Sequence, residues 1–146
     1  MAAQLIDGVA IAAKVRAEVA AGLKTLFSKH KVTPGLATVL VGTNPASETY
    51  VRAKRKACAE VSIRSYGHEL PANATQTQVE ALVATLNADA SVHGILVQLP
   101  LPNHLDEEAV LSTISIEKDV DGFHPINIGR LGMKGREPLF VPCTPD

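Results

Sequence analysis

The hydrophobic residues of this chain follow two patterns, short continuous runs and longer stretches at helical spacing. Residues 36–41 form a near-continuous apolar run that ends at Gly42, and residues 94–99 form a second run. Such runs are typical of parallel strands that are buried on both faces. A shorter strand is expected at residues 63–68, so the sequence predicts three strands.

Two long helices are predicted on either side of the first strand. Asp7 is placed to cap a helix that ends near His30. Its apolar stripe consists of Ile11, Val15, Val19, Leu23 and Leu26. Asn44 suits the cap of the second helix, and Pro45 suits its first position. This second helix is expected to extend to residue 61.

Two further helices complete the predicted pattern. Thr75 and Gln78 match a capping box ahead of apolar residues at helical spacing. Acidic residues at 106–108 favour the start of a last short helix that continues through Ile114. Helices and strands therefore alternate along the 146 residues. This order predicts an α/β fold, a doubly wound parallel sheet flanked by helices in a single domain.

Composition narrows the classes of function. Hydrophobic residues make up 46% of the chain and aromatic residues only 3%, as expected for parallel strands covered by alanine-rich helices. The formal net charge of -1 offers no field for nucleic acid. No apolar run approaches the roughly 18 residues of a membrane span. No signal peptide precedes the first helix, so we expect a cytoplasmic protein without nucleic-acid or membrane partners.

Neither the cysteines nor the histidines have metal-ligand spacing. Cys58 and Cys143 are far apart and belong to no Cys-x-x-Cys motif, so we expect free reduced thiols. The histidines show no paired spacing, and we therefore expect no metal. They are His30, His68, His93, His104 and His124.

Ser47, Tyr50 and Lys54 are the first candidates for a reaction site. Their spacing puts a hydroxyl, a phenol ring and an amine on one face of the second helix. That helix follows the carboxyl end of a predicted strand, where open α/β sheets place their ligand crevices. The alternative is a chance pairing, in which the ring packs and the ammonium stays in water.

Two more polar positions lie at the ends of predicted elements. Gln98 is a polar amide at the carboxyl end of a buried strand, so it needs a hydrogen-bond partner. That partner is either a neighbouring loop backbone or, in a functional site, a ligand or Lys54. Asp119 and Asp121 flank a valine in a turn-rich segment, and such loops commonly carry function.

These motifs together resemble the bifunctional methylenetetrahydrofolate dehydrogenase/cyclohydrolase family. The similarity is carried by residues 44–47, which run into Tyr50-x-x-x-Lys54-x-Lys56, by residues 94–102, and by residues 118–123. It extends from residues 6–8 to residues 142–145 and so covers essentially the whole chain. Several long motifs in one order are far more specific than a single tripeptide.

The resemblance implies a site for a folate that carries a one-carbon unit. Such enzymes oxidise 5,10-methylenetetrahydrofolate with a nicotinamide cofactor and hydrolyse the methenyl product to 10-formyltetrahydrofolate. By the same resemblance Lys54 is the catalytic amine, Gln98 holds or tunes it, and Tyr50 stacks on the folate. Asp121 accepts hydrogen bonds from the pterin, and Ser47 and Pro100 join the substrate-binding set. Hydrolysis itself requires general acid–base catalysis, which suits an amine.

The resemblance also implies a part that this chain does not contain. Family members continue into a Rossmann-type domain that binds NADP or NAD, with NADP the preferred expectation, and they are usually homodimers. No Gly-x-Gly-x-x-Gly motif occurs here. Gly129, Gly132 and Gly135 have a different spacing and lie in a predicted basic loop, not between a strand and a helix. We therefore expect no cofactor-binding residue in this chain. We therefore expect residues 1–146 to be the folate-binding catalytic domain. Ser62 stands where the family usually has glycine, which should alter a turn.

Two classes of function remain open at this stage. The chain is either the catalytic half of a folate enzyme or a truncated folate-binding or subunit-interaction module without turnover of its own. Two other matches fail on their residues. A short-chain dehydrogenase needs a glycine-rich turn where residues 42–45 stand, and a calcium loop needs a glutamate where Arg130 stands.

Overall fold

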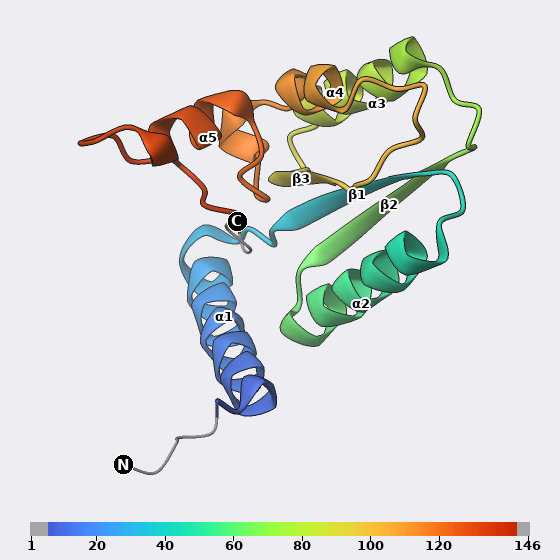
Figure 1. The fold of residues 1–146 in the computed structure, drawn as a ribbon. Helices are drawn as coiled ribbons and strands as arrows, with labels where there is room; N and C mark the ends of the chain where they lie inside the picture. Colours follow the sequence, from blue (N-terminus) through green and yellow to red (C-terminus); the bar gives the residue numbers. More distant parts are fainter. Residues whose placement is uncertain (1–5, 143–146) are drawn as a thin grey trace.

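The computed structural model describes residues 6–142, which form a three-stranded parallel sheet with helices on both faces (Figure 1). The strands are β1 (Gly35–Val41), β2 (Arg64–Leu70) and β3 (Gly94–Val97), and their order in the sheet is β2-β1-β3. β1 therefore lies in the centre, in register with β2 from Gly35↔Arg64 onward and with β3 from Leu36↔Gly94 onward. The predicted α/β class and parallel sheet are confirmed.

The second and third strands differ from their predicted bounds. β2 begins and ends later than expected, and β3 ends at Val97, two residues early. The backbone N–H of Gln98 still donates to the Val39 carbonyl at 2.9 Å, but the chain then reaches Pro100. A proline has no N–H to donate, so it cannot extend the ladder. Gln98 consequently lies just beyond the carboxyl end of β3.

The predicted helix starts are confirmed by their caps. Asp7 accepts from the Val9 and Ala10 amides at the start of α1 (Gly8–His30). Asn44 caps α2 (Pro45–Val61), with Pro45 at the first position, and Thr75 and Gln78 form the capping box of α3 (Gln76–Ala88). α4 (Glu107–Thr113) is capped by Asp106. Each cap satisfies N–H groups that the first helical turn leaves free.

The prediction that α4 is the last helix is wrong. A short 3-10 turn (Ile116–Lys118) and α5 (Pro125–Gly132) follow it. The His124 ring accepts from the Ile126 amide at 3.1 Å, so a histidine takes the capping place that Ser, Thr, Asp or Asn usually fills. Gly129 and Gly132 lie inside or at the end of this helix, not in the predicted basic loop.

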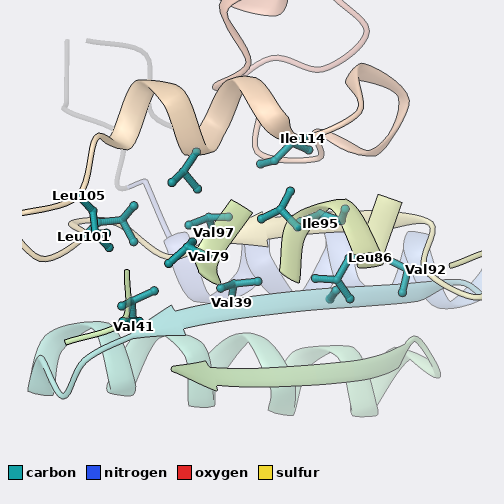
Figure 2. Close-up of a cluster of buried hydrophobic side chains, with 14 residues drawn as sticks. Val39, Val41, Val79, Leu86, Val92, Ile95, Val97, Leu101, Leu105 and Ile114 are labelled. Carbon is teal, nitrogen blue, oxygen red and sulfur yellow. The ribbon is translucent and has the colours of Figure 1, made fainter. Parts of the chain in front are cut away.

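The core lies between the sheet and the pair α3 and α4. Figure 2 shows Val39 and Val97 of the sheet facing Val79 and Leu86, and the buried cluster continues through Ile95 to Ile114. On the other face, α2 covers β1 and β2 with Val51, Cys58 and Val61. These two helix layers hold β1 rigidly, so the segments at its carboxyl end start from a fixed base.

The predicted first helix is confirmed, but its apolar stripe does not enter the core. None of the residues in α1 is buried, and Ile11, Val15 and Val19 are 53%, 51% and 40% exposed. Figure 1 shows α1 leaning away from the sheet, and its main contacts with the other helices and strands are with α2. Helical spacing thus predicted the helix correctly without predicting what covers it.

The remaining expectations concern thiols, metals and membranes. Cys58 is a free buried thiol, and burial raises its pKa, whereas Cys143 lies outside the described residues. Among residues 6–142, the side chains of His, Cys, Asp and Glu form no group of three that could hold a metal ion. No described helix combines the length and the apolar character needed to cross a bilayer.

The turn after α2 is strained at one residue, Ser62. Its φ of 69° and ψ of 33° are left-handed, the conformation that glycine adopts at helix ends without a steric penalty. We predict that Ser62→Gly raises the free energy of unfolding by about 0.5–1 kcal/mol in urea titration, because relief of the clash exceeds the added chain entropy of glycine. The matched control Ser62→Ala keeps the Cβ and should give no gain. Equal gains in both variants would contradict the strain.

Candidate functional site

One face of α2 carries the three predicted side chains at the carboxyl end of β1. The Asn44 cap and Pro45 start α2 soon after the strand, which brings Ser47, Tyr50 and Lys54 to this edge of the sheet. Ser47 is buried, at 2% exposure, whereas Tyr50 is 63% exposed. Lys54 is half-buried between these extremes. The helix gives the predicted spacing of the three residues, but Ser47 is buried in the fold and Tyr50 is open to solvent.

Lys54 is held by the amide of Gln98 from the end of β3. The Lys54 Nζ donates to Gln98 Oε1 at 3.2 Å, and Gln98 Nε2 donates to the Leu99 carbonyl at 2.8 Å. Both partners considered for Gln98 are therefore used, one by each end of its amide. Because Nε2 is occupied by the backbone, the oxygen is directed to the ammonium. This contact joins residues that are 44 positions apart in the sequence.

Asp121 is the third member of the group, and it is half-buried. Burial raises the pKa of its carboxyl above the ordinary value, the positive charge of Lys54 lowers it, and the negative charge of Asp119 raises it again. Lys54 and Asp121 therefore lie close enough for their charges to interact. Within residues 6–142 they form no direct ion pair, which leaves both groups available to a ligand.

The loop that carries Asp121 is anchored on its amino side by a residue to which the sequence prediction gave no role. Lys118 Nζ donates to the Leu86, Asn87 and Asp89 carbonyls at 2.7–3.1 Å. These carbonyls belong to the end of α3, where a cation is favoured by the helix dipole. In the sequence, Lys118 is notable only for its place directly before Asp119. The carbonyls that it binds are about 30 residues away, so the sequence did not reveal this role.

Pro100 lies on the other side of Gln98. It is exposed and borders a hollow between the loop after β1 and residues 100–103. A separate, larger hollow lies on the β2 side of α2 and is lined by Glu48, Arg52, Arg55 and Glu69. Its two acidic and two basic groups balance each other, and it contains none of the predicted site residues. We therefore place the candidate site at Lys54, Gln98 and Asp121, on the β3 side.

This edge combines four kinds of group that suit a flat, polar, aromatic ligand. Lys54 can donate or exchange a proton, Asp121 can accept two parallel hydrogen bonds, and the exposed Tyr50 ring can stack on a ligand ring. Gln98 fixes the amine in place. The described residues contain no glycine-rich phosphate loop between a strand and a helix.

The charge of Lys54 gives a testable consequence at Asp121. We predict that Lys54→Met raises the pKa of the Asp121 carboxyl further, since it removes the one charge that lowers this pKa. A raised pKa means that the folded state binds this proton more tightly than the unfolded chain does. The contribution to stability is then present at low pH and is lost as the pH rises through the folded pKa. Carboxyl ¹³C NMR titration measures the pKa.

The exposed Lys56 supplies the matched control for this titration, because Lys56→Met removes an equal charge from the solvent side of the same helix. It should leave the Asp121 titration unchanged. If both variants shift Asp121 equally, the effect comes from net charge and not from the Lys54 contact.

Comparison with known proteins supports the family resemblance found in the sequence motifs. Residues 6–121 match the family model described as tetrahydrofolate dehydrogenase/cyclohydrolase, catalytic domain. The chain is 57% identical over 143 residues to "Bifunctional protein FolD 2" of Arabidopsis thaliana. The alignment covers 98% of this chain and 48% of that protein. The chain thus spans about half the length of the curated relatives it matches.

Two solved structures share the fold. The bifunctional FolD enzyme of Campylobacter jejuni superposes with a TM-score of 0.89 at 49% identity, over 97% of this chain and 50% of that one. The Trypanosoma brucei FolD, solved with an NADP cofactor and an inhibitor, gives a TM-score of 0.92 at 44% identity, over 97% and 48%. By sequence and by fold, the chain belongs to the tetrahydrofolate dehydrogenase/cyclohydrolase family.

Proposed function

We propose that residues 1–146 are the folate-binding catalytic domain of an enzyme with two activities in one-carbon metabolism. The first oxidises 5,10-methylenetetrahydrofolate to the methenyl form, and the second hydrolyses that product to 10-formyltetrahydrofolate. The observation that carries the proposal is the Lys54–Gln98 hydrogen bond of 3.2 Å beside the charge-coupled Asp121. Membership of the family supports the substrate class.

Substrate recognition would begin at Asp121. An ionised carboxylate accepts hydrogen bonds from an amino group and an adjacent ring N–H, and the pterin ring presents such a donor pair. The exposed ring of Tyr50 would stack on the folate. Pro100 would border the ligand, and Ser47 would support the helix beneath it. With the pterin at Asp121, the one-carbon bridge would come close to Lys54.

Lys54 would then perform the proton chemistry of hydrolysis. Water must add to the cationic amidine carbon of the methenyl form, a proton must pass from that water to the ring nitrogen N5, and the bond between the carbon and N5 must break, which leaves the formyl group on N10. The Lys54 amine can take and return this proton. Gln98 would hold it toward the bridge, because the hydrogen bond from Gln98 Nε2 to the Leu99 carbonyl fixes the amide with its oxygen toward Lys54. In this scheme Lys54 and Tyr50 contact the substrate, and Gln98 orients Lys54.

Oxidation would require a nicotinamide cofactor, which accepts the hydride. We propose NADP, since the T. brucei relative was solved with that cofactor. The site residues described here do not suit a dinucleotide. We therefore propose that the cofactor is held mainly by polypeptide outside residues 1–146, in a Rossmann-type domain. A homodimer and a cytoplasmic location stay predictions.

A second candidate function is a folate-binding or subunit-interaction module that does not turn over alone. Two observations favour it. Tyr50 is largely exposed, so the site is open on one side, and the apolar face of α1 is uncovered. An open site admits bulk water and weakens electrostatic catalysis. Activity of the 146-residue chain distinguishes this module from a working hydrolytic site.

The first prediction concerns turnover. We predict that the 146-residue chain accelerates the loss of methenyltetrahydrofolate absorbance and that Lys54→Met abolishes the acceleration, because the proton-transfer group is gone. Lys56→Met is the control and should retain the rate. The melting temperature of Lys54→Met should be close to that of the unmodified chain, since a half-buried amine at a cleft edge adds little to stability. Binding of a folate analogue without any turnover would favour the module.

The second prediction concerns affinity. Asp121→Asn should weaken binding of a folate analogue by about 1.5–3 kcal/mol, the value of hydrogen bonds to a charged group, which is roughly 10- to 150-fold in Kd. Isothermal titration calorimetry measures the loss. Glu48→Gln, on the opposite flank of α2, is the matched control and should bind normally. Unchanged affinity in Asp121→Asn would remove this residue from the pterin site.

A further inference from the structure

The carboxylate of Asp119 is almost completely buried, at 1% exposure. Among the described residues it takes part in no ion pair. Buried charges in proteins are usually paired, because removal from water is costly. The one neighbouring lysine in sequence, Lys118, directs its ammonium to the carbonyls of α3 instead. Among the described residues, no lysine or arginine therefore pairs with the Asp119 carboxylate.

Neutral N–H donors hold this carboxylate. Its Oδ2 accepts from the His124 backbone N–H at 2.9 Å and from Asn127 Nδ2 at 2.8 Å. Asn127 is fully buried, and its Oδ1 accepts from the Leu139 N–H at 2.9 Å. One chain of hydrogen bonds thus joins the Asp121 loop, α5 and the segment near residue 139.

The backbone on both sides of Asp121 is fixed as well. Asp119 forms an isolated parallel bridge with Ile95, the neighbour of the first residue in β3. Gly122 has a φ of 73°, and a Cβ at this position would lie 2.8 Å from the Pro142 nitrogen. The loop is therefore clamped between β3 and residues 140–142. Asp121 has little freedom to move away from its charged neighbours.

We propose that Asp119 is a positioning residue for Asp121, one that holds the loop through hydrogen bonds and supplies a fixed negative charge beside the ligand-binding carboxyl. The hydrogen-bonding role and the charge of Asp119 can be separated by an asparagine at this position. An amide oxygen in place of Oδ2 accepts the same two hydrogen bonds without the charge. The charge is thus not needed to hold the loop, and its effect is on the ionisation of Asp121.

Each charged or titratable group near these two carboxyls has a defined position. Lys54 belongs to α2 and its charge lowers the pKa of Asp121, whereas Asp119 belongs to the same loop as Asp121 and its charge raises this pKa. His124 begins α5, and its ring is engaged in the helix cap. β3 and residues 139–142 contribute no charged side chain. Burial, Lys54 and Asp119 therefore act together on the pH at which Asp121 becomes able to accept from a ligand, and of the three only the two charges can be removed by a single conservative substitution.

The consequence for folate depends on the proposed function, but the test of the charge does not. The experiment is a carboxyl ¹³C NMR titration of Asp121 in the 146-residue chain without folate, compared with Asp119→Asn. We expect Asp119→Asn to retain the fold and to lower the pKa of Asp121, because a repelling charge is gone. If a folate analogue binds, the pH below which it is released should also move lower. An unchanged Asp121 titration in folded Asp119→Asn would overturn the proposal.

The unmodified chain gives the reference for this comparison. Its Asp121 carboxyl is expected to titrate above the ordinary aspartate value, because burial and, after it, the Asp119 charge raise this pKa against the effect of Lys54. His124→Asn is the control for the other titrating group, because asparagine keeps the cap acceptor, and it should leave the Asp121 pKa unchanged. Failure of folate to bind at any pH would count against the proposed function while the titration result stands.

Discussion

The hydrogen bond between Lys54 and Gln98 is the contact on which the candidate site depends. It links α2, which follows β1, to the residue just beyond β3, and these strands are direct neighbours in the sheet. The parallel arrangement brings both carboxyl ends to one edge, so an amine and an amide far apart in sequence meet there. Helices pack on both faces of β1 and fix the distance between Lys54 and Gln98, because neither layer of helices can shift without disturbing the core.

Electrostatic balance gives this edge its chemical character. Asp121 experiences burial and the Asp119 charge, which both favour its neutral form, and the Lys54 charge, which favours its ionised form. An aspartate in such a setting responds to small changes in its surroundings, including a ligand that donates hydrogen bonds. The same arrangement keeps the Lys54 amine and the Asp121 carboxyl near each other without a direct ion pair between them.

Local rules predicted much of the fold from the sequence. The caps at Asp7, Asn44 and Thr75 act within a few residues, and the apolar runs of β1 and β3 reflect burial on both faces, so both were readable. α5 was missed because His124 acts as its cap and glycines interrupt its pattern. The exposure of the α1 stripe could not be predicted, since periodicity says which face is apolar but not what packs on it.

The candidate site was predictable to a similar degree. Lys54, Tyr50 and Gln98 lie near carboxyl ends of predicted strands, so their proximity followed from the topology. The roles of Lys118 and Asn127 did not, because their partners are tertiary: the end of α3, the Asp119 carboxylate and the Leu139 backbone. Such partners depend on how loops return to the sheet, and no local pattern in the sequence encodes them.

The most direct test of the site is a crystal structure of this chain with a bound folate analogue. We predict that the pterin lies within hydrogen-bond distance of Asp121, that its ring stacks on Tyr50, and that the one-carbon position is next to Lys54 Nζ. An analogue bound instead in the hollow between α2 and β2, against Arg52 and Arg55, would contradict the assignment of the site to the β3 side of α2.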